Sequence, residues 1–246
     1  MDLVVAAAFA IVALLYSAVG QAGGTGYVAV MGVLGYAPDV IKPTVLALNV
    51  LVAAIGCARF HRNGLLSWRA CYPFGVLALP FSFVGGTLNL PAAAYQPVVG
   101  LLLLLAAAQM ARSARRAARL DLQALCEPPF GMSLLAGAAI GLVSGITGVG
   151  GGIFLAPLIL AMGWAETRKA AAIAATFNLL NSAAALAGAA ATVHDLPVQL
   201  PVWSAAVVFG GVVGSWLGST LMRPSLMRLL LAILLALAGF RMVAHP

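Results

Sequence analysis

Two glycine-rich segments contain the residues of this chain that are best suited to bind a solute. The first reads GQAGGTG from residue 20 to 26, and the second reads GVGGG from 148 to 152. Consecutive glycines do not sustain a helix well, and they adopt backbone conformations that other residues avoid. A helix that begins after such a break presents unpaired N–H groups and the positive end of its dipole, which together attract anions. The chemistry predicted here is anion binding by backbone amides.

Polar side chains near these segments extend the candidate site. We expect the amides of Gly23, Gly24, Gly26, Gly150, Gly151 and Gly152 to hold an oxyanion, with further polar contacts from Gln21, Thr25, Asn49, Thr147, Thr176 and Asn178. Asn178 shares a polar stripe with Asn181 and Ser182, because residues three and four apart lie on one face of a helix. Two alternatives stay open: the side chains can serve as hydrogen bonds between helices, and the glycines can serve close helix packing.

The charged and nucleophilic residues argue against catalysis and against a buried proton relay. All acidic residues lie at segment ends or in loops, whereas proton-coupled carriers commonly keep a carboxylate within a span. The cysteines show no metal-ligand spacing, so we expect no metal site and no cofactor. Ser144 and His194 invite comparison with an intramembrane serine protease, but His194 falls in a predicted loop, and we expect no enzymatic activity. A coupling ion, if one is used, is a proton or sodium.

The elements that must position these residues are membrane-spanning helices. Of 246 residues, 63% are hydrophobic and 8% charged, against about 45–50% and about 25% in soluble domains. This composition excludes a soluble enzyme. It also excludes nucleic-acid binding despite a net charge of +7, because the basic residues cluster between apolar runs as in cytoplasmic loops. The apolar runs fall at 3–19, 27–36, 40–58, 70–88, 92–111, 132–147, 153–164, 170–193, 200–221 and 226–244. Only 27–36 and 153–164 are near half of the roughly 20 residues that a bilayer crossing needs.

The glycine segments occur twice because the chain is duplicated. At an offset of 128 residues, Gly20, Gly23, Gly24 and Gly35 align with Gly148, Gly151, Gly152 and Gly163. We therefore expect two transmembrane repeats, 1–118 and 130–246, joined by a cytoplasmic linker at 119–129 within one integral membrane domain. If each glycine cluster and its short helix reverse the chain, each repeat crosses the membrane five times and the second is inverted. Only Lys42 and Arg241 of the 13 Lys and Arg residues then lie outside. Four crossings per repeat would divide the positive charges more evenly.

The predicted fold is thus an all-α polytopic membrane protein of two inverted repeats. Each repeat has four full transmembrane helices plus one short, broken half-helix after a glycine cluster, and both termini lie outside.

The second repeat resembles the TauE/SafE sulfite exporter family. The resemblance rests on the segment GITGVGGGIFLAPL from Gly145 to Leu158 and on AATFN from Ala174 to Asn178. The first repeat fits more loosely, with Ala29 where the second repeat has Pro157. The resemblance implies movement of small sulfur-containing anions, such as sulfite or organosulfonates, usually as export.

The expected function is a secondary transporter of a small anionic solute in a bacterial-type plasma membrane. Transport would proceed by alternating access around a midplane anion site. The expected partners are the solute, the lipid bilayer and a coupling ion, with no nucleic acid. The alternative is a passive anion channel with the same glycine-lined constriction.

Overall fold

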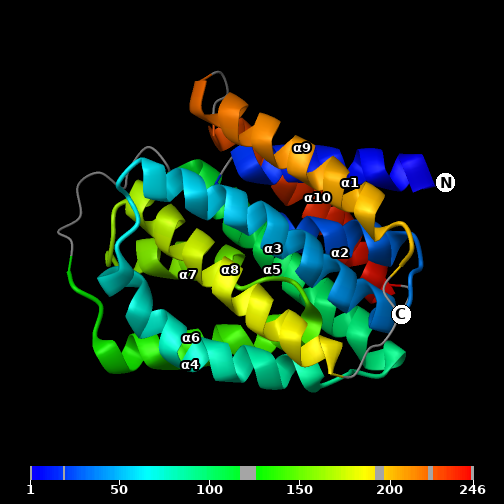
Figure 1. Ribbon diagram of the computed structural model, residues 1–246, viewed down its shortest axis with the longest axis horizontal. Helices are drawn as coiled ribbons and strands as arrows, with labels where there is room; N and C mark the ends of the chain where they lie inside the picture. The colour runs from blue at the N-terminus through cyan, green and yellow to red at the C-terminus, as the bar shows by residue number, and fades with distance from the viewer. Residues whose placement is uncertain (1, 19, 117–125, 192–196, 221–223, 245–246) are drawn as a thin grey trace.

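The chain folds into a bundle of α-helices, shown in a computed structural model that describes residues 2–18, 20–116, 126–191, 197–220 and 224–244. Within these ranges there are ten helices and no strands (Figure 1). The helices are α1 (Asp2–Ala18), α2 (Gly24–Val33), α3 (Pro38–Arg62), α4 (Trp68–Thr87), α5 (Ala92–Arg116), α6 (Phe130–Thr147), α7 (Gly152–Ala161), α8 (Thr167–Ala190), α9 (Leu200–Thr220) and α10 (Pro224–Ala244). The all-helical prediction is confirmed, and the second helix of each predicted repeat is short. Residues 119–125 of the predicted linker lie outside the described residues.

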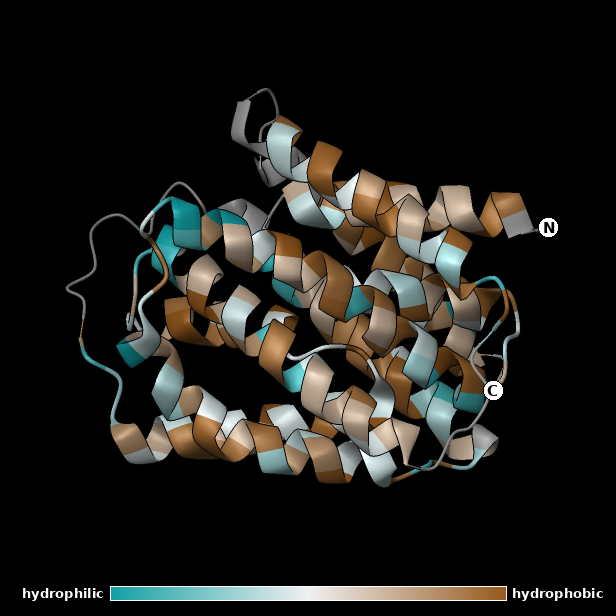
Figure 2. Cartoon of the chain, in the orientation of Figure 1, coloured by the Kyte–Doolittle hydropathy of each residue, from teal (hydrophilic) through white to brown (hydrophobic). Residues whose placement is uncertain are grey.

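The helices have the composition of a membrane-embedded bundle. Six of those described are long and apolar enough to cross a membrane: α3, α4, α5, α6, α8 and α9. The apolar stretches described in α1 and α10 are shorter, Leu3–Ala18 and Leu231–Ala244. Apolar residues cover most of the helix length, and hydrophilic residues lie mainly near helix ends and in loops (Figure 2). Large side chains such as Leu135, Phe209 and Phe240 are about 70% exposed, as expected of a surface that faces lipid.

Helices of one half pack against helices of the other half. The pairs α1 with α9 and α4 with α6 lie on opposite sides of the bundle (Figure 1). Both contacts depend on glycine: a Cβ on Gly137 would overlap the carbonyl of Phe74, and a Cβ on Gly210 would overlap that of Ala10. Small residues let helix backbones approach closely in a membrane, so close packing does explain the glycines of these two pairs.

Two pairs of helices that occupy matching places in the two halves, α5 with α10 and α3 with α8, run in opposite directions. A Cβ on Gly100 in α5 would lie 2.7 Å from Val243 in α10, and a Cβ on Gly239 would lie 3.0 Å from Leu104, so residue numbers rise in one helix as they fall in the other. Helices α3 and α8 show the same relation, as the contacts of the candidate site make clear below. An inverted repeat requires this antiparallel relation, and we carry inversion forward as a proposal.

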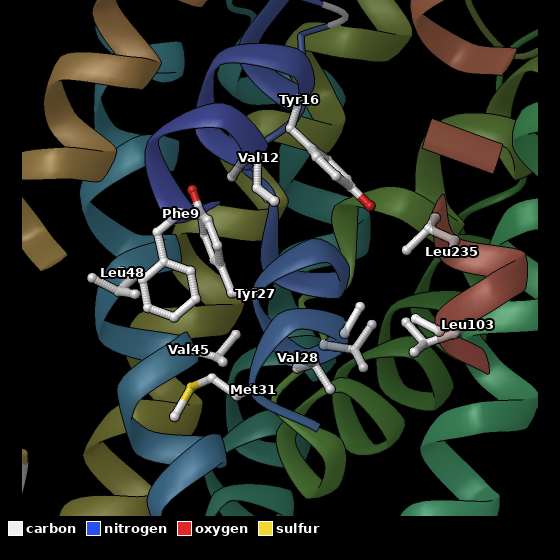
Figure 3. Close-up of a cluster of buried hydrophobic side chains, with 14 of the residues drawn as sticks. Phe9, Val12, Tyr16, Tyr27, Val28, Met31, Val45, Leu48, Leu103 and Leu235 are labelled. Carbon is white, nitrogen blue, oxygen red and sulfur yellow. The ribbon is translucent and has the colours of Figure 1, made fainter. Parts of the chain in front are cut away.

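The short helix α2 is held in the interior by apolar packing. Its side chains contribute to a buried cluster with Phe9 of α1 and Leu48 of α3 (Figure 3). The ring of Tyr27 meets the ring of Phe9 edge to face, with centroids 5.4 Å apart. This packing fixes where the first turn of α2 lies, and therefore positions one half of the candidate site.

Candidate functional site

Both glycine segments break the helix as predicted. Helix α1 ends at Ala18 and α2 begins at Gly24, while α6 ends at Thr147 and α7 begins at Gly152. Four glycines in the breaks have positive φ, namely Gly20 (79°), Gly23 (95°), Gly148 (75°) and Gly150 (83°). An L-residue with a side chain rarely adopts this conformation, so the glycines are what permits the chain to leave one helix and enter the next.

The first turn of α2 and the residues just before α7 leave backbone donors free. Within the described part of the chain, the N–H groups of Gly24, Thr25 and Gly26 have no hydrogen-bond acceptor, and neither do those of Gly150 and Gly151. The N–H of Gly152 is the exception, because it donates to a side-chain oxygen described next. Free donors at two helix N-termini are the feature that anion binding requires.

The two breaks meet each other in the interior of the bundle. A Cβ on Gly24 would overlap the carbonyl oxygen of Val149, which belongs to the second break. A Cβ on Gly150 would lie 2.5 Å from Asn49 Nδ2 and 2.8 Å from Asn178 Oδ1. The first break, the second break and one asparagine from each of α3 and α8 therefore surround one place.

A hydrogen-bond network joins α3 to α8 at this place. Asn49 Nδ2 donates to Asn178 Oδ1 at 3.2 Å and to Ser182 Oγ at 2.8 Å. The N–H of Gly152 also reaches Asn178 Oδ1, at 3.4 Å. Asn49 is 0% exposed and Asn178 5% exposed, so these are buried polar groups. Farther along, a Cβ on Gly56 would lie 4.0 Å from Ala175. Residue numbers therefore fall in α8 as they rise in α3, so the two helices are antiparallel.

A third buried asparagine, Asn181, has a structural role. Asn181 accepts a hydrogen bond from Ser82 Oγ of α4 and donates one to Ser144 Oγ of α6 at 2.6 Å. All its hydrogen-bonding atoms thus face neighbouring helices, as the interhelical alternative predicted for this stripe. Ser144, the nucleophile considered for a protease, is engaged in this network, and His194 lies outside the described residues.

The hydroxyl groups of the predicted threonines all have partners within the protein. Thr147 Oγ1 accepts a hydrogen bond from the N–H of Val149 in the second break, at 3.5 Å. Thr25 Oγ1 pairs with the hydroxyl of Tyr16 at 2.6 Å, while Thr147 and Thr176 donate to the carbonyls of Val143 and Ala172. The remaining glycines are closely packed. At the first break, Gly23 lies against Tyr27, and Gly26 lies against Val12 and Tyr16. At the second break, Gly151 lies against Phe177 and Ile140.

A cavity of about 760 Å³ leads to the site from one side. It follows the C-terminal half of α3 and the N-terminal half of α8, and Gln21, Gly152 and Asn178 line it. Arg59 and Arg168 also line it, at the ends of the two helices. Sequence reasoning used these arginines only for topology. Their convergence follows from the antiparallel α3–α8 pair, which no local pattern reveals.

The opposite side of the site is more closed. A smaller cavity of about 310 Å³ lies there, lined by Lys42, Tyr95 and Ile146 among others, and it shares no lining residue with the first. Tyr95 donates its hydroxyl hydrogen to the carbonyl of Thr147 at 2.8 Å, which fixes α5 to the start of the second break. Lys42 is 2% exposed, and its Nζ donates to the carbonyl of Leu88 at 2.7 Å.

The fold and the site define a polytopic α-helical membrane protein whose two broken helices meet in its interior. The family described as "Sulfite exporter TauE/SafE" matches residues 5–242, and the chain belongs to that family. It is 48% identical over 238 residues to the probable membrane transporter protein y4hK of Sinorhizobium fredii, covering 97% of this chain and 96% of that relative.

A more distant relative is the probable membrane transporter protein MJ0441 of Methanocaldococcus jannaschii. It is 30% identical over 142 residues, which are 55% of this chain and 51% of the relative. No solved structure matches the chain significantly. Family membership and these relatives make the chain a membrane transporter.

Proposed function

We propose that the chain is a secondary transporter that exports a small sulfur-containing anion, such as sulfite or an organosulfonate, across the plasma membrane. The single observation that carries this proposal is the meeting of two broken helices, with free backbone N–H groups, at the end of a cavity lined by two arginines. The family description, sulfite exporter, supports the choice of solute.

The distribution of charge supports an anion as the solute. Arg59 and Arg168 line the cavity near the ends of their helices, where a positive potential raises the local concentration of anions. The interior site instead offers neutral donors: backbone amides, and Asn178 with Asn49 behind it. Neutral donors bind an anion without leaving a fixed buried charge when the site is empty, and such a charge would be costly in a membrane.

The arrangement of the two cavities supports alternating access over a channel. The larger cavity reaches the site, whereas on the other side Tyr95 and Lys42 tie neighbouring segments together through backbone carbonyls. With the proposed inverted topology, the arginine-lined side is cytoplasmic, and the structure corresponds to an inward-open state.

The acidic side chains that the structure describes do not lie inside the bundle, where a carboxylate could couple proton movement to transport. Asp39, Glu127 and Glu166 are all exposed. We therefore propose that coupling depends on the solute's own charge and protonation, with a proton as the coupling ion in preference to sodium.

Counterflow in proteoliposomes tests the transporter proposal. Vesicles that contain the purified protein and unlabelled sulfite are diluted into trace ³⁵S-sulfite, with protein-free vesicles as the control. A carrier gives transient accumulation of label that saturates with sulfite concentration. Single-channel currents without counterflow would establish the passive channel instead, and no movement of sulfite or of any organosulfonate would refute the proposed function.

A further inference from the structure

One buried acceptor at the site has no donor. Among the described residues, Asn49 Oδ1 is shielded from solvent and forms no hydrogen bond. Buried polar groups in native structures are nearly always paired, so an unpaired one requires an explanation. This oxygen lies where the two breaks meet, since a Cβ on Gly24 would be 3.2 Å from it.

The hydrogen-bond network fixes which atom of the Asn49 amide is unpaired. The N–H of Gly152 can only donate, so the atom of Asn178 that faces it is an oxygen. That same oxygen faces the Asn49 amide, which must therefore present its nitrogen. Turning the Asn49 amide over would set two acceptors against each other. The oxygen of Asn49 is thus left pointing toward the first residue of α2.

The site therefore offers donors and an unpaired side-chain acceptor at the same place. Unpaired N–H groups of Gly24 and Gly150 match the negatively charged oxygens of a solute. The unpaired oxygen of Asn49 matches a hydrogen that the solute itself carries. A fully deprotonated oxyanion would leave this acceptor unpaired and add repulsion to it, whereas an oxyanion with one hydroxyl group satisfies both kinds of partner.

We propose that the transported species is a singly protonated oxyanion, whose hydroxyl group donates to Asn49 Oδ1 while its charged oxygens accept from the amides at the two breaks. This inference rests on the proposed function and narrows its substrate class to protonated sulfite, because an ionised organosulfonate has no hydroxyl group to donate. Hydrogensulfite, in the form that carries the proton on oxygen, has the required chemistry. The solute then carries the proton across, and no protein side chain has to release one. Export of the protonated monoanion equals export of one dianion together with one proton.

A matched pair of probes tests the inference on the unaltered protein. Methylphosphonate below its second ionisation and methanesulfonate are both tetrahedral monoanions with one methyl group, but only the phosphonate has a hydroxyl group. Binding is measured by competition with ³⁵S-sulfite. We expect methylphosphonate to compete about tenfold to a hundredfold better, because a site built around a hydroxyl donor leaves a buried acceptor unpaired when the donor is missing.

The pH dependence supplies a second, independent measurement. Above the second ionisation of the probe, competition by methylphosphonate should weaken about tenfold per pH unit, while competition by methanesulfonate stays constant. The titratable and charged groups on the helices around this oxygen are Asp2 and Tyr16 on α1, Tyr27 on α2, Asp39, Lys42, Cys57, Arg59, His61 and Arg62 on α3, and Arg168 and Lys169 on α8. Titration of any of them would change the binding of both probes alike, so the difference between the probes reports on the solute.

A pair of asparagine variants locates the effect. Asn49→Leu should bring the ratio of the two affinities to about one, because the acceptor is gone. Asn181→Leu is the matched control, an equally buried asparagine whose amide atoms all bond to neighbouring helices, and it should keep the wild-type ratio. The ratio in wild-type protein stands on its own even where a variant does not fold.

Each remaining outcome decides the matter. Equal or better competition by methanesulfonate in the wild type would refute the protonated substrate, while anion transport stands. A wild-type preference for methylphosphonate that persists in Asn49→Leu would also refute the assigned contact. If neither probe competes although sulfite is moved, the inference is refuted and the proposed function stands. If sulfite is not moved either, the proposed function falls together with this inference.

Discussion

Replacing Gly150 by alanine should strongly reduce transport, because it disturbs the candidate site and does not only strain the backbone. Gly150 has φ of 83°, and a Cβ there would lie 2.5 Å from Asn49 Nδ2 and 2.8 Å from Asn178 Oδ1. Real Cβ atoms do not approach other atoms so closely, so at least one amide has to move. Whichever amide moves, the hydrogen bond between the two asparagines is lost.

The expected loss of stability is measured against the same substitution at Gly35, a glycine with a similar φ and no close neighbours. Gly35 has φ of 77°, and a Cβ there would meet nothing within 4 Å. Both substitutions carry the left-handed strain of about 1–2 kcal/mol. Gly150→Ala adds a lost hydrogen bond of about 1 kcal/mol and crowding of about 1–3 kcal/mol. We therefore expect Gly150→Ala to be about 2–4 kcal/mol less stable than Gly35→Ala.

Transport and stability are measured on both variants in the same preparations. Thermal unfolding in detergent should rank wild type above Gly35→Ala and Gly35→Ala above Gly150→Ala. Sulfite counterflow per inserted molecule should fall by at least about tenfold in Gly150→Ala, because tenfold corresponds to 1.4 kcal/mol and one lost polar contact is of that order. Gly35→Ala should retain near wild-type flux. Equal flux in the two variants would show that the meeting point of the breaks is not the transport site.

Other parts of the structure give further predictions. Arg59→Gln and Arg168→Gln should each slow sulfite uptake at low salt by about threefold or more, and the difference should shrink in high salt, which screens attraction by exposed charges. Tyr95→Phe removes a hydrogen bond of about 1 kcal/mol on the closed side, so a cysteine-reactive probe should label engineered cysteines in the smaller cavity about fivefold faster; unchanged labelling would exclude this gate. Gly137→Ala should destabilise the α4–α6 contact by about 1–3 kcal/mol, whereas Gly131→Ala on the same helix, with open space around it, should not lower the unfolding temperature. A reporter fused to the C-terminus should read as external; a cytoplasmic signal would contradict the inverted topology.

The two breaks were predictable because their causes are local. Glycine permits positive φ wherever it stands, and an apolar run shorter than a bilayer is visible by counting. The convergence of Asn49 and Asn178 was partly predictable as well. They lie 129 residues apart in the chain, close to the 128-residue offset between the repeats, so two equivalent helices were expected to present them.

What each polar residue contacts was not predictable, because the contacts come from helix crossings. Asn178 and Asn181 stand three residues apart on one stripe, yet one faces the breaks and the other faces α4 and α6. Thr147 and Thr176 have the same polarity as the asparagines, but each bonds to a carbonyl of its own helix, as threonine often does within helices. Spacing identifies the polar face of a helix and does not identify its partner.

The larger cavity is lined by arginines, whereas the site itself offers only neutral donors, and this difference affects how the empty carrier reorients. A buried arginine would bind an oxyanion tightly and would leave a charge without a partner after release, which would oppose reorientation of the empty protein. Amides from two separate breaks avoid this cost, and they belong to different halves of the bundle. Movement of one half relative to the other would separate the α2 amides from the α7 amides and so weaken the site. Binding of the solute would then favour the state in which the breaks meet, and the energy available to drive reorientation is limited to the difference in affinity between the two states.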